Sequence, residues 1–395
     1  MNPEAPYYVY ERKMIEDACR QLKESLPGFD FLYSVKSNPF PPVLRVVRQQ
    51  GFGADAASLR EVEESLGCGM LPEDVYYSAP GKREKDIRGA LGKCVLIADS
   101  LHELRMIQRI AAEQGKEERV GLRVHPGFAM GDAVAESSKF GIDMEQLPAL
   151  RDTLRACPNL KPAGMHVHLK SQVLDAEILA GYYRNVMQLA VELREACEMD
   201  MEFINFGAGI GTVYDEVKDR PVDFAKLKAA AQEILAVNRK LHARLLIETG
   251  RFVICRAGKY IVPVVDKKMS HGITYLIVAN GMNGFMRPAI AALLEKVTEG
   301  KTLPGLEPLF TSSHEFRVRA LNGTCEQETV NIVGNLCTPL DIIKNNVTMN
   351  RTEIGDLIEI TNAGSYACTL SPVQFSGQER PAQYLLTEDG QWIQE

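Results

Sequence analysis

Short apolar runs alternate with segments of helical periodicity through residues 31–249 of the chain. In Leu101–Gln114, apolar residues recur at intervals of three and four, which predicts a helix with one buried face. The eight apolar runs of strand length are Phe31–Lys36, Gly51–Ala57, Val75–Pro80, Cys94–Asp99, Val120–His125, Gly164–Leu169, Phe203–Gly207 and Leu245–Thr249. Strands that alternate with helices form a parallel sheet, and eight such units predict an α/β fold closed into a (β/α)8 (TIM) barrel. A doubly wound open sheet is the alternative, because periodicity does not show closure.

The pattern changes after Arg251, where strand-like runs follow one another with little helix between them. These runs are Phe252–Ile261, Val264–Asp266, Thr274–Val278, Thr329–Val333, Leu357–Thr361 and Gln383–Leu386. Closely spaced short strands with glycine and proline turns predict a β-rich second domain. Within it, Ala289–Lys296 has the pattern of a helical turn, and Thr298–Pro308 has that of a loop.

Composition narrows the class of protein. The chain has 395 residues, of which 45% are hydrophobic and 25% charged, the usage of a soluble globular protein with more than one ordinary core. Its net charge of −7 gives no basic excess for binding nucleic acid. No apolar stretch approaches the length of a membrane span, and the nine cysteines form no C-x-x-C pair. We therefore expect a reduced, cytoplasmic protein that acts on a small molecule.

In a parallel barrel the active site lies at the carboxyl ends of the strands. The polar residues predicted at those ends are Lys36, Asp55, Lys82, His125, His168, the Gly207–Gly211 loop, Glu248 and Arg251. The alternative explanation for these residues is structural, because any strand ends in polar residues where it reaches water. A lysine in a partly apolar pocket has a lowered pKa and forms a Schiff base with a carbonyl group, so Lys36 is a candidate nucleophile or a surface lysine.

Three further segments carry candidate chemistry. The glycines of Gly207–Gly211 would aim amide donors at an anion, or they form only a tight turn. Glu248 is a candidate general base, metal ligand or partner of a protonated heterocycle, or it pairs with Arg251 in a structural ion pair. His166 and His168 are expected to face the same side of a strand, where they would bind zinc, stack on a planar ligand or pack in the core. The sequence offers no clear third zinc ligand.

Taken together, the motifs resemble those of the fold-type III decarboxylases that use pyridoxal 5'-phosphate, a family that includes diaminopimelate, ornithine and arginine decarboxylases. The matching segments, in order, are Tyr33–Asn38 (Y-A-V-K-A-N in the family), Asp55–Glu61 (D-x-A-S-x-x-E), Ser78–Lys82 (G-P-G-K), Lys139–Gly141 (K-F-G), His166–Gln172 (H-x-H-I-G-S-Q), Gly207–Gly211 (G-G-G-F-G), Glu248–Arg251 (E-P-G-R), Gly281–Ala289 (G-M-N-D-L-x-R-P-A), Gly334–Asp341 (G-x-x-C-E-x-x-D) and Gly364–Tyr366 (G-A-Y). So many motifs in one order are specific to the family.

The resemblance implies a role for each matching residue. Lys36 would carry the cofactor, His168 would stack on its ring, and Glu248 would pair with the pyridine nitrogen. The other implied cofactor-binding residues are Asp55, Ser171, Gly207, Gly209, Gly211, Gly250, Arg251 and Tyr366. Cys337 would come from the partner subunit of a homodimer with shared active sites and would reprotonate Cα.

The resemblance also implies two domains. A barrel that binds the cofactor would span residues 25–265, and residues 1–24 with 266–395 would form a β-domain of the Greek-key or β-sandwich type that contributes to the dimer's active site.

Two departures from diaminopimelate decarboxylase concern the substrate, for which the implied binding residues are Arg287, Thr338, Asp341 and Tyr366. Thr338 replaces a glutamate that reads the distal end of diaminopimelate, and Ala291 replaces a tyrosine. Two more departures, Lys170 and Ala208, replace glycines near the cofactor. The C-T-P-x-D form resembles the decarboxylases of siderophore pathways and the butirosin enzyme that acts on glutamate held by an acyl carrier protein.

We therefore predict a decarboxylase of a conjugated or non-standard L-amino acid in secondary metabolism, with a siderophore-type or carrier-protein-tethered substrate. Diaminopimelate decarboxylase of lysine biosynthesis is the alternative. A racemase of the same fold type, a zinc hydrolase and an inactive homologue that acts as a binding or regulatory protein are further alternatives. Because Lys36 and Cys337 are both present, the sequence favours an active decarboxylase.

Overall fold

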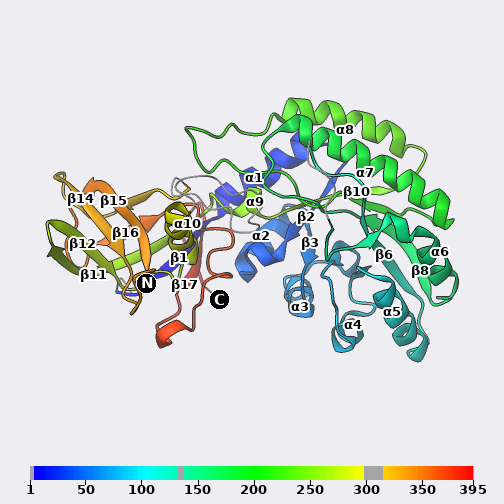
Figure 1. Cartoon of the computed structure of the whole chain (residues 1–395), viewed down its shortest axis with the longest axis horizontal. Helices are drawn as coiled ribbons and strands as arrows, with labels where there is room; N and C mark the ends of the chain where they lie inside the picture. Colours follow the sequence, from blue (N-terminus) through cyan, green and yellow to red (C-terminus); the bar gives the residue numbers. More distant parts are fainter. Residues whose placement is uncertain (1–3, 132–136, 298–314, 395) are drawn as a thin grey trace. The chain divides into compact units, whose positions relative to one another are not determined.

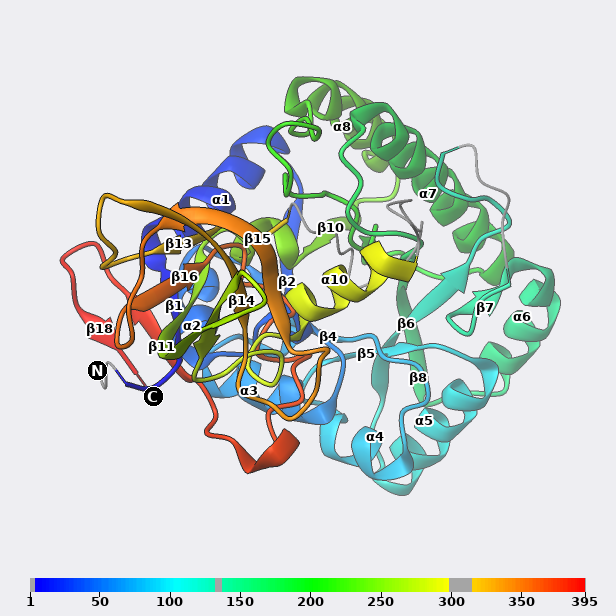
Figure 2. The same ribbon diagram turned by 60° about the vertical axis from the view of Figure 1, so that its left-hand side comes forward.

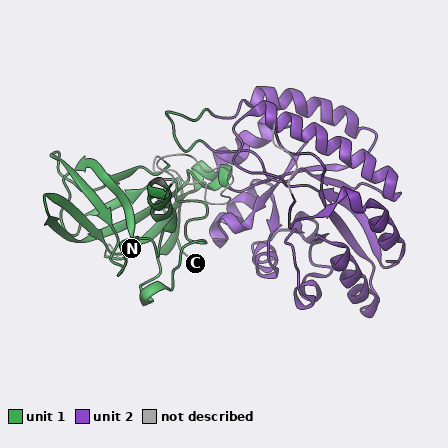
Figure 3. Cartoon of the chain, in the orientation of Figure 1, with its two compact units in different colours: residues 1–15, 213–220, 251–395 green, residues 16–212, 221–250 purple. Residues whose placement is uncertain are grey.

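The computed structural model describes residues 4–131, 137–297 and 315–394, so the predicted loop at Thr298–Pro308 lies outside the described residues. The chain divides into two compact units (Figure 3). One unit comprises residues 16–212 and 221–250, and we call it the barrel unit. The other, the sheet unit, comprises residues 1–15, 213–220 and 251–395.

Eight parallel strands close the barrel unit (Figure 1). They are β2 (Asp30–Ser34), β3 (Gly53–Ala56), β4 (Val75–Tyr77), β5 (Val95–Ala98), β6 (Glu118–His125), β8 (Leu160–His166), β9 (Phe203–Asn205) and β10 (Arg244–Thr249). Each strand pairs with the next in this order, and β10 pairs with β2, which closes the ring. The predicted (β/α)8 barrel is therefore confirmed, and the open sheet is not. A short strand, β7 (Ile142–Asp143), pairs with the end of β6.

Helices cover the outside of the barrel, as Figure 2 shows for α4, α5, α6 and α7. The helices of this region are α1 (Arg12–Ser25), α2 (Pro41–Gln49), α3 (Leu59–Gly67), α4 (Glu84–Ala90), α5 (Leu101–Glu113), α6 (Leu147–Arg155), α7 (Ala176–Cys197) and α8 (Phe224–Asn238), with 3₁₀ turns η1 (Val35–Ser37), η2 (Pro72–Asp74) and η3 (Met144–Gln146). The predicted helix at Leu101–Gln114 is α5, and its N-cap Ser100 accepts a hydrogen bond from the Glu103 amide.

The sixth barrel strand differs from its prediction, which began at Gly164. In the structure β8 begins at Leu160, and Pro162 lies inside it. The register with β6 shifts at this point, because Val120 pairs with Pro162 whereas Gly121 pairs with Gly164. The bulge accommodates a residue that cannot donate a ladder hydrogen bond, so the strand continues through Pro162.

The described residues of the sheet unit form nine strands in one branched sheet. They are β1 (Tyr7–Glu11), β11 (Gly258–Ser270), β12 (Ile273–Val278), β13 (Val318–Ala320), β14 (Gln327–Val333), β15 (Ile342–Asn350), β16 (Leu357–Ile360), β17 (Ala382–Leu386) and β18 (Trp392–Ile393). The first half of β11 pairs with β1 and β16, and the second half pairs with β12. The remaining elements are the helices α9 (Arg251–Ile254) and α10 (Met286–Val297) and the 3₁₀ turn η4 (Phe375–Gly377). A β-rich second domain is thus confirmed.

The predicted strand at Phe252–Ile261 is wrong in its first half. Phe252 lies in the short helix α9, and the strand begins only at Gly258. The second half of that predicted strand and the predicted strand at Val264–Asp266 are both parts of the single long strand β11. The helical turn predicted at Ala289–Lys296 is the core of the longer helix α10.

The boundaries of the compact units also differ from the domain limits expected from the sequence. Residues 16–24 belong to the barrel unit, and residues 251–265 belong to the sheet unit. The physical reason is strand pairing, because Gly258–Ile261 pairs with Tyr7–Tyr10 of β1. Among the described residues, no helix is both long and apolar enough to cross a membrane.

Candidate active site

Lys36 lies immediately beyond β2, in the 3₁₀ turn η1 rather than in the strand itself. Its Nζ donates to Asp55 Oδ2 at 2.8 Å, and the Asp55 side chain is 0% exposed. The Lys36 side chain is 43% exposed, so the amine rests against a buried carboxylate while one side remains accessible. The structure therefore brings together the predicted nucleophile and a predicted cofactor-binding residue.

Gly250 explains how the turn with Lys36 packs beside the end of β10. A Cβ atom at this position would lie 2.8 Å from Ser37 Oγ and 3.2 Å from Ser34 Cβ. Any side chain would therefore displace the residues that flank Lys36. Gly250 is therefore needed for the close approach between the ends of β2 and β10.

Lys82 and His125, two other strand-end candidates, have partners within the barrel unit. Lys82 Nζ is buried and donates to Glu103 Oε2 at 3.0 Å and to the carbonyl oxygens of Ala79 and Ile97 at 2.6 Å each. His125 Nδ1 lies 3.1 Å from Asp143 Oδ1. Burial lowers the pKa of Lys82, but three acceptors surround its amine, so its geometry is that of a structural ion pair.

Glu248 is 3% exposed and is held by two neighbouring strands. Asn205 Nδ2 donates to Oε1 at 2.8 Å, and His166 Nε2 lies 3.1 Å from the same oxygen. The second contact is close enough for a charge interaction, although neither nitrogen of His166 makes a well-aligned hydrogen bond to a described residue. Burial alone would raise the pKa of Glu248. The nearby His166, Lys36 and His168 together lower the pKa by more than burial raises it, so the net shift is downward. Glu248 is therefore an anion at neutral pH, with Oε2 open to a ligand.

The two histidines do not share a strand, contrary to the prediction. β8 ends at His166, which is buried, and His168 lies in the following loop. His168 Nδ1 accepts a hydrogen bond of 3.0 Å from the Ala208 amide, so Nδ1 carries no proton in this arrangement. No group of three or more metal-ligating side chains occurs in the described parts of the chain, so the zinc interpretation gains no support.

The glycine-rich loop is tied to the loop after β8 on both sides. Val173 donates to the Gly209 carbonyl and accepts from the Gly211 amide, each at 2.9 Å. Gly207 has φ +67°, and a Cβ there would collide with the Val167 carbonyl. The glycines at Gly207 and Gly211 therefore serve a close approach between two backbones, a reason that the sequence analysis did not give.

Most amides of this loop already have acceptors. The amide of Gly207 donates to Asn205 Oδ1 at 2.9 Å, and that of Ala208 donates to His168. Among the described residues, the amides of Gly209 and Ile210 donate to no acceptor. Two adjacent amide donors at this position can hold one anion.

A strained residue fixes the far side of the loop. Gln172 has φ 59°, in the left-handed region, and follows Ser171, one of the predicted cofactor-binding residues. Its side-chain amide donates to the Thr212 carbonyl at 2.6 Å and accepts from the Thr212 amide at 3.1 Å. These two reciprocal bonds stabilise the strained backbone and hold the Ser171 segment beside the glycine-rich loop.

The Glu61 carboxyl lies near the carboxyl end of β3 and caps the N-terminus of α3. Its Oε2 accepts a hydrogen bond of 2.7 Å from the Ala57 amide, and its own amide donates to Ser58 Oγ. Burial raises the pKa of Glu61 to about 7, and the Ala57 amide offsets only part of that effect. The folded protein therefore retains a proton that the unfolded chain loses near pH 4.5.

Replacing Glu61 by Gln is expected to stabilise the protein at alkaline pH. Because the folded-state pKa lies above the unfolded value, the wild-type free energy of unfolding falls as the pH rises from 4.5 through about 7. Gln keeps the cap but does not ionise, so E61Q should gain about 2 to 3 kcal/mol over wild type at pH 8 and almost nothing at pH 4.5. Urea unfolding across this pH range measures the difference. The matched control is E63Q, an exposed position on the same helix, and an equal gain in E63Q would contradict the assignment.

In the sheet unit, Arg251, Tyr214 and Tyr366 form one cluster. Arg251 donates to Tyr214 Oη at 2.7 Å, and its guanidinium carbon lies 5.0 Å from the centre of the Tyr366 ring. Tyr366, a predicted site residue, has φ 52° and so also lies in the left-handed region. Burial raises the pKa of Tyr214 to about 12, so its hydroxyl stays protonated at neutral pH.

Arg287, predicted to meet the substrate, is 0% exposed. Its guanidinium lies 3.0 Å from Glu315 Oε2 and donates to the Ser365 carbonyl at 3.2 Å. It also stacks on the rings of Tyr214 and Phe316. A carboxylate of the same unit therefore balances the charge of Arg287.

The loop 334–341 carries Cys337, Thr338 and Asp341. Both oxygens of Asp341 accept backbone amides, Oδ1 from Met282 at 2.6 Å and Oδ2 from Leu336 at 2.9 Å. This buried carboxylate shapes the loop, which gives it a structural role that the prediction did not include. Cys337 is exposed, and Thr338 Oγ1 accepts the Leu340 amide.

Two site neighbours were missed from the sequence. Asn205 holds Glu248 and the Gly207 amide, and Tyr214 holds Arg251. Asn205 is the polar residue within the apolar run Phe203–Phe206, a signal that could have found it. Tyr214 has no comparable signal, because it lies in a loop.

A family profile described as "Pyridoxal-dependent decarboxylase, pyridoxal binding domain" matches residues 12–255, which is more than half of the chain. The chain belongs to this family. The resemblance drawn from the motifs is thereby confirmed, as are pyridoxal phosphate as the cofactor and decarboxylation of an amino acid as the class of reaction.

Curated relatives match nearly the whole decarboxylase chain. The L-glutamyl-[BtrI acyl-carrier protein] decarboxylase of Niallia circulans is 28% identical, over 97% of this chain and 89% of the relative. A diaminopimelate decarboxylase of Archaeoglobus fulgidus is 27% identical, over 97% and 88% respectively. The crystal structure of diaminopimelate decarboxylase from Helicobacter pylori complexed with L-lysine has a TM-score of 0.81 at 24% identity, over 99% of this chain and 93% of that chain, and so supports the fold.

Proposed function

We propose that this decarboxylase removes the α-carboxylate of an L-amino acid attached to a larger group, with a carrier-protein-bound or otherwise conjugated substrate. The observation that carries the proposal is the pair of neutral residues Thr338 and Ala291, where diaminopimelate decarboxylases have a glutamate and a tyrosine. Without those partners the distal ammonium and carboxylate of diaminopimelate would be buried unpaired, which is costly. The Niallia circulans relative, named for an acyl-carrier-protein substrate, supports the same class.

The residues of the barrel unit fit pyridoxal phosphate. Lys36 has an accessible amine, Glu248 has one free carboxylate oxygen, and the amides of Gly209 and Ile210 are available to a phosphate. When bound, pyridoxal phosphate supplies an electron sink for the electron pair left on Cα as carbon dioxide departs. Ser171, Gly207, Gly211 and Gly250 are the other proposed cofactor-binding residues of the barrel unit. The motif resemblance also assigns Arg251 and Tyr366 to the cofactor, and both belong to the sheet unit.

The protein's own groups then have distinct tasks. Glu248 would keep a proton on the pyridine nitrogen by charge, and His168 would support the ring face. Lys36 would hold the cofactor, and Asp55, whose Oδ2 accepts from Lys36 Nζ at 2.8 Å, would receive the Lys36 ammonium whenever that amine is released.

Cys337 is proposed to return a proton to Cα, which replaces the departed carboxylate. It is exposed in the single chain, which agrees with a residue that acts in the partner's site of a homodimer.

Substrate preference tests this function. We expect carbon dioxide release from a glutamyl-acyl-carrier-protein thioester or a similar amino acid conjugate to exceed that from free diaminopimelate, ornithine or lysine by about a hundredfold in kcat/KM. The control is Thr338→Glu, which restores the missing carboxylate and should raise activity on diaminopimelate while lowering it on the conjugate.

A preference of the wild-type enzyme for diaminopimelate would contradict the proposal and support the second candidate, diaminopimelate decarboxylase. That candidate is favoured by the comparable identity of the Archaeoglobus fulgidus relative and by the presence of Arg287. The pairing of Arg287 with Glu315 weakens it, because a neutralised guanidinium attracts a second carboxylate less.

A further inference from the structure

The carboxylate that receives Lys36 is oriented by a second hydrogen bond. Asp55 Oδ2 accepts from Lys36 Nζ at 2.8 Å, whereas Oδ1 accepts from Ser78 Oγ at 2.5 Å. Asp55 is completely buried and Ser78 is nearly so, which shields the bond between them from water and leaves the carboxylate little freedom. Glu61 and Glu248 also interact with Lys36 by charge, and neither contacts Ser78. The direction in which Oδ2 points therefore depends on the Ser78 hydroxyl.

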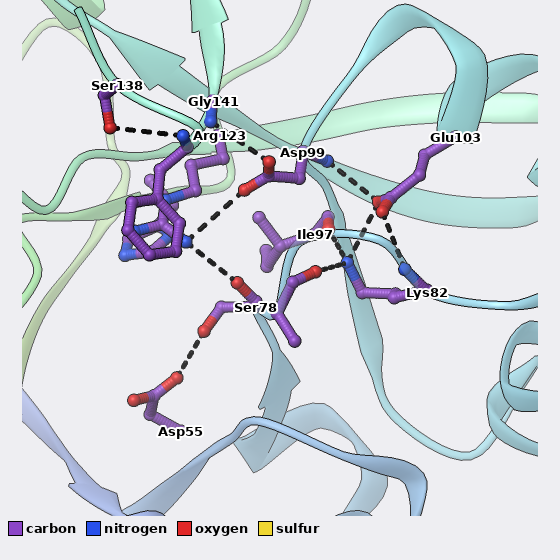
Figure 4. A network of polar contacts seen from close by, with 12 residues as sticks. Asp55, Ser78, Lys82, Ile97, Asp99, Glu103, Arg123, Ser138 and Gly141 are labelled. Carbon is purple, nitrogen blue, oxygen red and sulfur yellow. Dashed lines mark hydrogen bonds and ion pairs between the residues drawn. The ribbon is translucent and has the colours of Figure 1, made fainter.

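Ser78 is itself held from both sides. It follows β4, where its amide donates to the Ala56 carbonyl at 3.1 Å. Its carbonyl accepts a hydrogen bond of 3.1 Å from the guanidinium of Arg123, a buried residue of β6 (Figure 4). Contacts from β3 and β6 thus fix the backbone of Ser78, which carries the hydroxyl that faces Asp55.

The same guanidinium holds a loop at the mouth of the barrel. Arg123 lies 3.3 Å from Asp99 Oδ1, and Asp99 Oδ2 accepts the Gly141 amide at 3.1 Å (Figure 4). The guanidinium carbon lies 4.4 Å from the centre of the Phe140 ring. Burial raises the pKa of Asp99, and the nearby Arg123 cation offsets that effect. Asp99 therefore compensates the charge of Arg123. It also holds the guanidinium in the position from which it donates to the Ser78 carbonyl.

We propose that Ser78 and Arg123 are positioning residues for Lys36, because they fix the Asp55 carboxylate and so set the pH at which the Lys36 amine becomes available to the cofactor. This inference rests on the proposed function, in which Lys36 carries pyridoxal phosphate. Attachment joins Nζ to the aldehyde carbon and releases the aldehyde oxygen as water with two hydrogens of the neutral amine. The Lys36 ammonium must first lose one proton to solvent, and a carboxylate that binds it more tightly delays that step.

Removal of the Ser78 hydroxyl takes away a hydrogen bond that stabilises the negative charge of Asp55. The Asp55 carboxylate then attracts the Lys36 ammonium more strongly. In Ser78→Ala we therefore expect the pH midpoint of attachment to rise by about half a unit, with about threefold slower attachment below the midpoint. The cofactor-free full-length protein is mixed with pyridoxal phosphate at a series of pH values, and the reaction is stopped with borohydride. Mass spectrometry of the pyridoxyl-Lys36 peptide then gives the rate, a readout that does not depend on turnover.

Conservative variants separate positioning from general loosening. Ser78→Thr keeps the hydroxyl and should restore the wild-type profile, whereas Arg123→Lys should shift it in the same direction as S78A. The double variant S78A/R123K should shift it no further than S78A, because both residues act through Asp55.

The matched control is Arg244→Lys, which alters an ion pair with Asp30 and Asp74 at the opposite ends of the barrel strands. S78A and R123K profiles that coincide with wild type, or an equal shift in R244K, would overturn the inference. Wild-type protein that acquires no label at Lys36 would instead overturn the proposed function, which keeps the two failures apart.

Discussion

Lys36→Ala is expected to abolish covalent retention of the cofactor and to reduce turnover by about 10⁴-fold or more. The reason is geometric as well as chemical, because Lys36 places its amine against the buried Asp55 carboxylate at the mouth of the barrel. No variant without an amine at this position can hold the aldehyde carbon of the cofactor. Visible absorbance, borohydride trapping with peptide mapping and carbon dioxide release measure the three consequences.

Two comparisons make this result specific. Lys36→Arg keeps a cation beside Asp55 but offers no nucleophilic amine at neutral pH, so it should fold like wild type and remain unlabelled. Lys82 is the internal comparison, because it is a buried lysine near the strand ends whose amine is surrounded by Glu103 and two carbonyl oxygens. Label on Lys82 of the wild-type protein, or activity retained in K36R, would contradict the assignment.

Glu248→Gln is expected to lower kcat by about 10²- to 10³-fold while the cofactor remains attached to Lys36. Gln matches the shape of Glu and can keep the Asn205 contact, but it has no negative charge to hold a proton on the pyridine nitrogen. Because Glu248 is 3% exposed, water cannot replace that charge. Steady-state kinetics and the absorbance of the bound cofactor report the two properties separately.

The control for this variant is Glu248→Asp. It keeps the negative charge but places it farther from the cofactor by the length of one methylene group. It should lose less kcat than E248Q, and its loss should be in kcat rather than in cofactor content. If E248Q kept its kcat within about threefold of wild type, the charge of Glu248 would have no part in the reaction.

The barrel was predictable because its strands and helices obey local rules. The run Leu245–Thr249 is apolar up to its last two residues, and the structure makes it β10 with the site residue Glu248 near its carboxyl end. The Leu101–Gln114 periodicity likewise corresponds to α5. The side chains at the ends of such strands converge by topology alone, so Lys36, Asp55 and Glu248 could be grouped without coordinates.

Other features were hidden because their causes are not local. The strand β15 was missed since Ile342–Asn350 contains mostly polar residues, and only pairing with β14 makes it extended. The structural role of Asp341 was missed since its amide partners at Met282 and Leu336 come from two loops. The purpose of Gly250 was likewise invisible, because it depends on contact with Ser37 from the first barrel strand's turn.

The pairing of β1 with both β11 and β17 bears on how the chain folds during synthesis. Residues 7–11 leave the ribosome long before their parallel neighbour at 382–386, because more than 370 residues separate the two strands in sequence. The barrel strands between residues 30 and 249 are complete well before then, and they pair mainly with near neighbours in sequence. The barrel can therefore form co-translationally, while β1 must wait for the sheet to close, with its aromatic and apolar side chains uncovered. In cells, this interval is when the chain has most need of a chaperone.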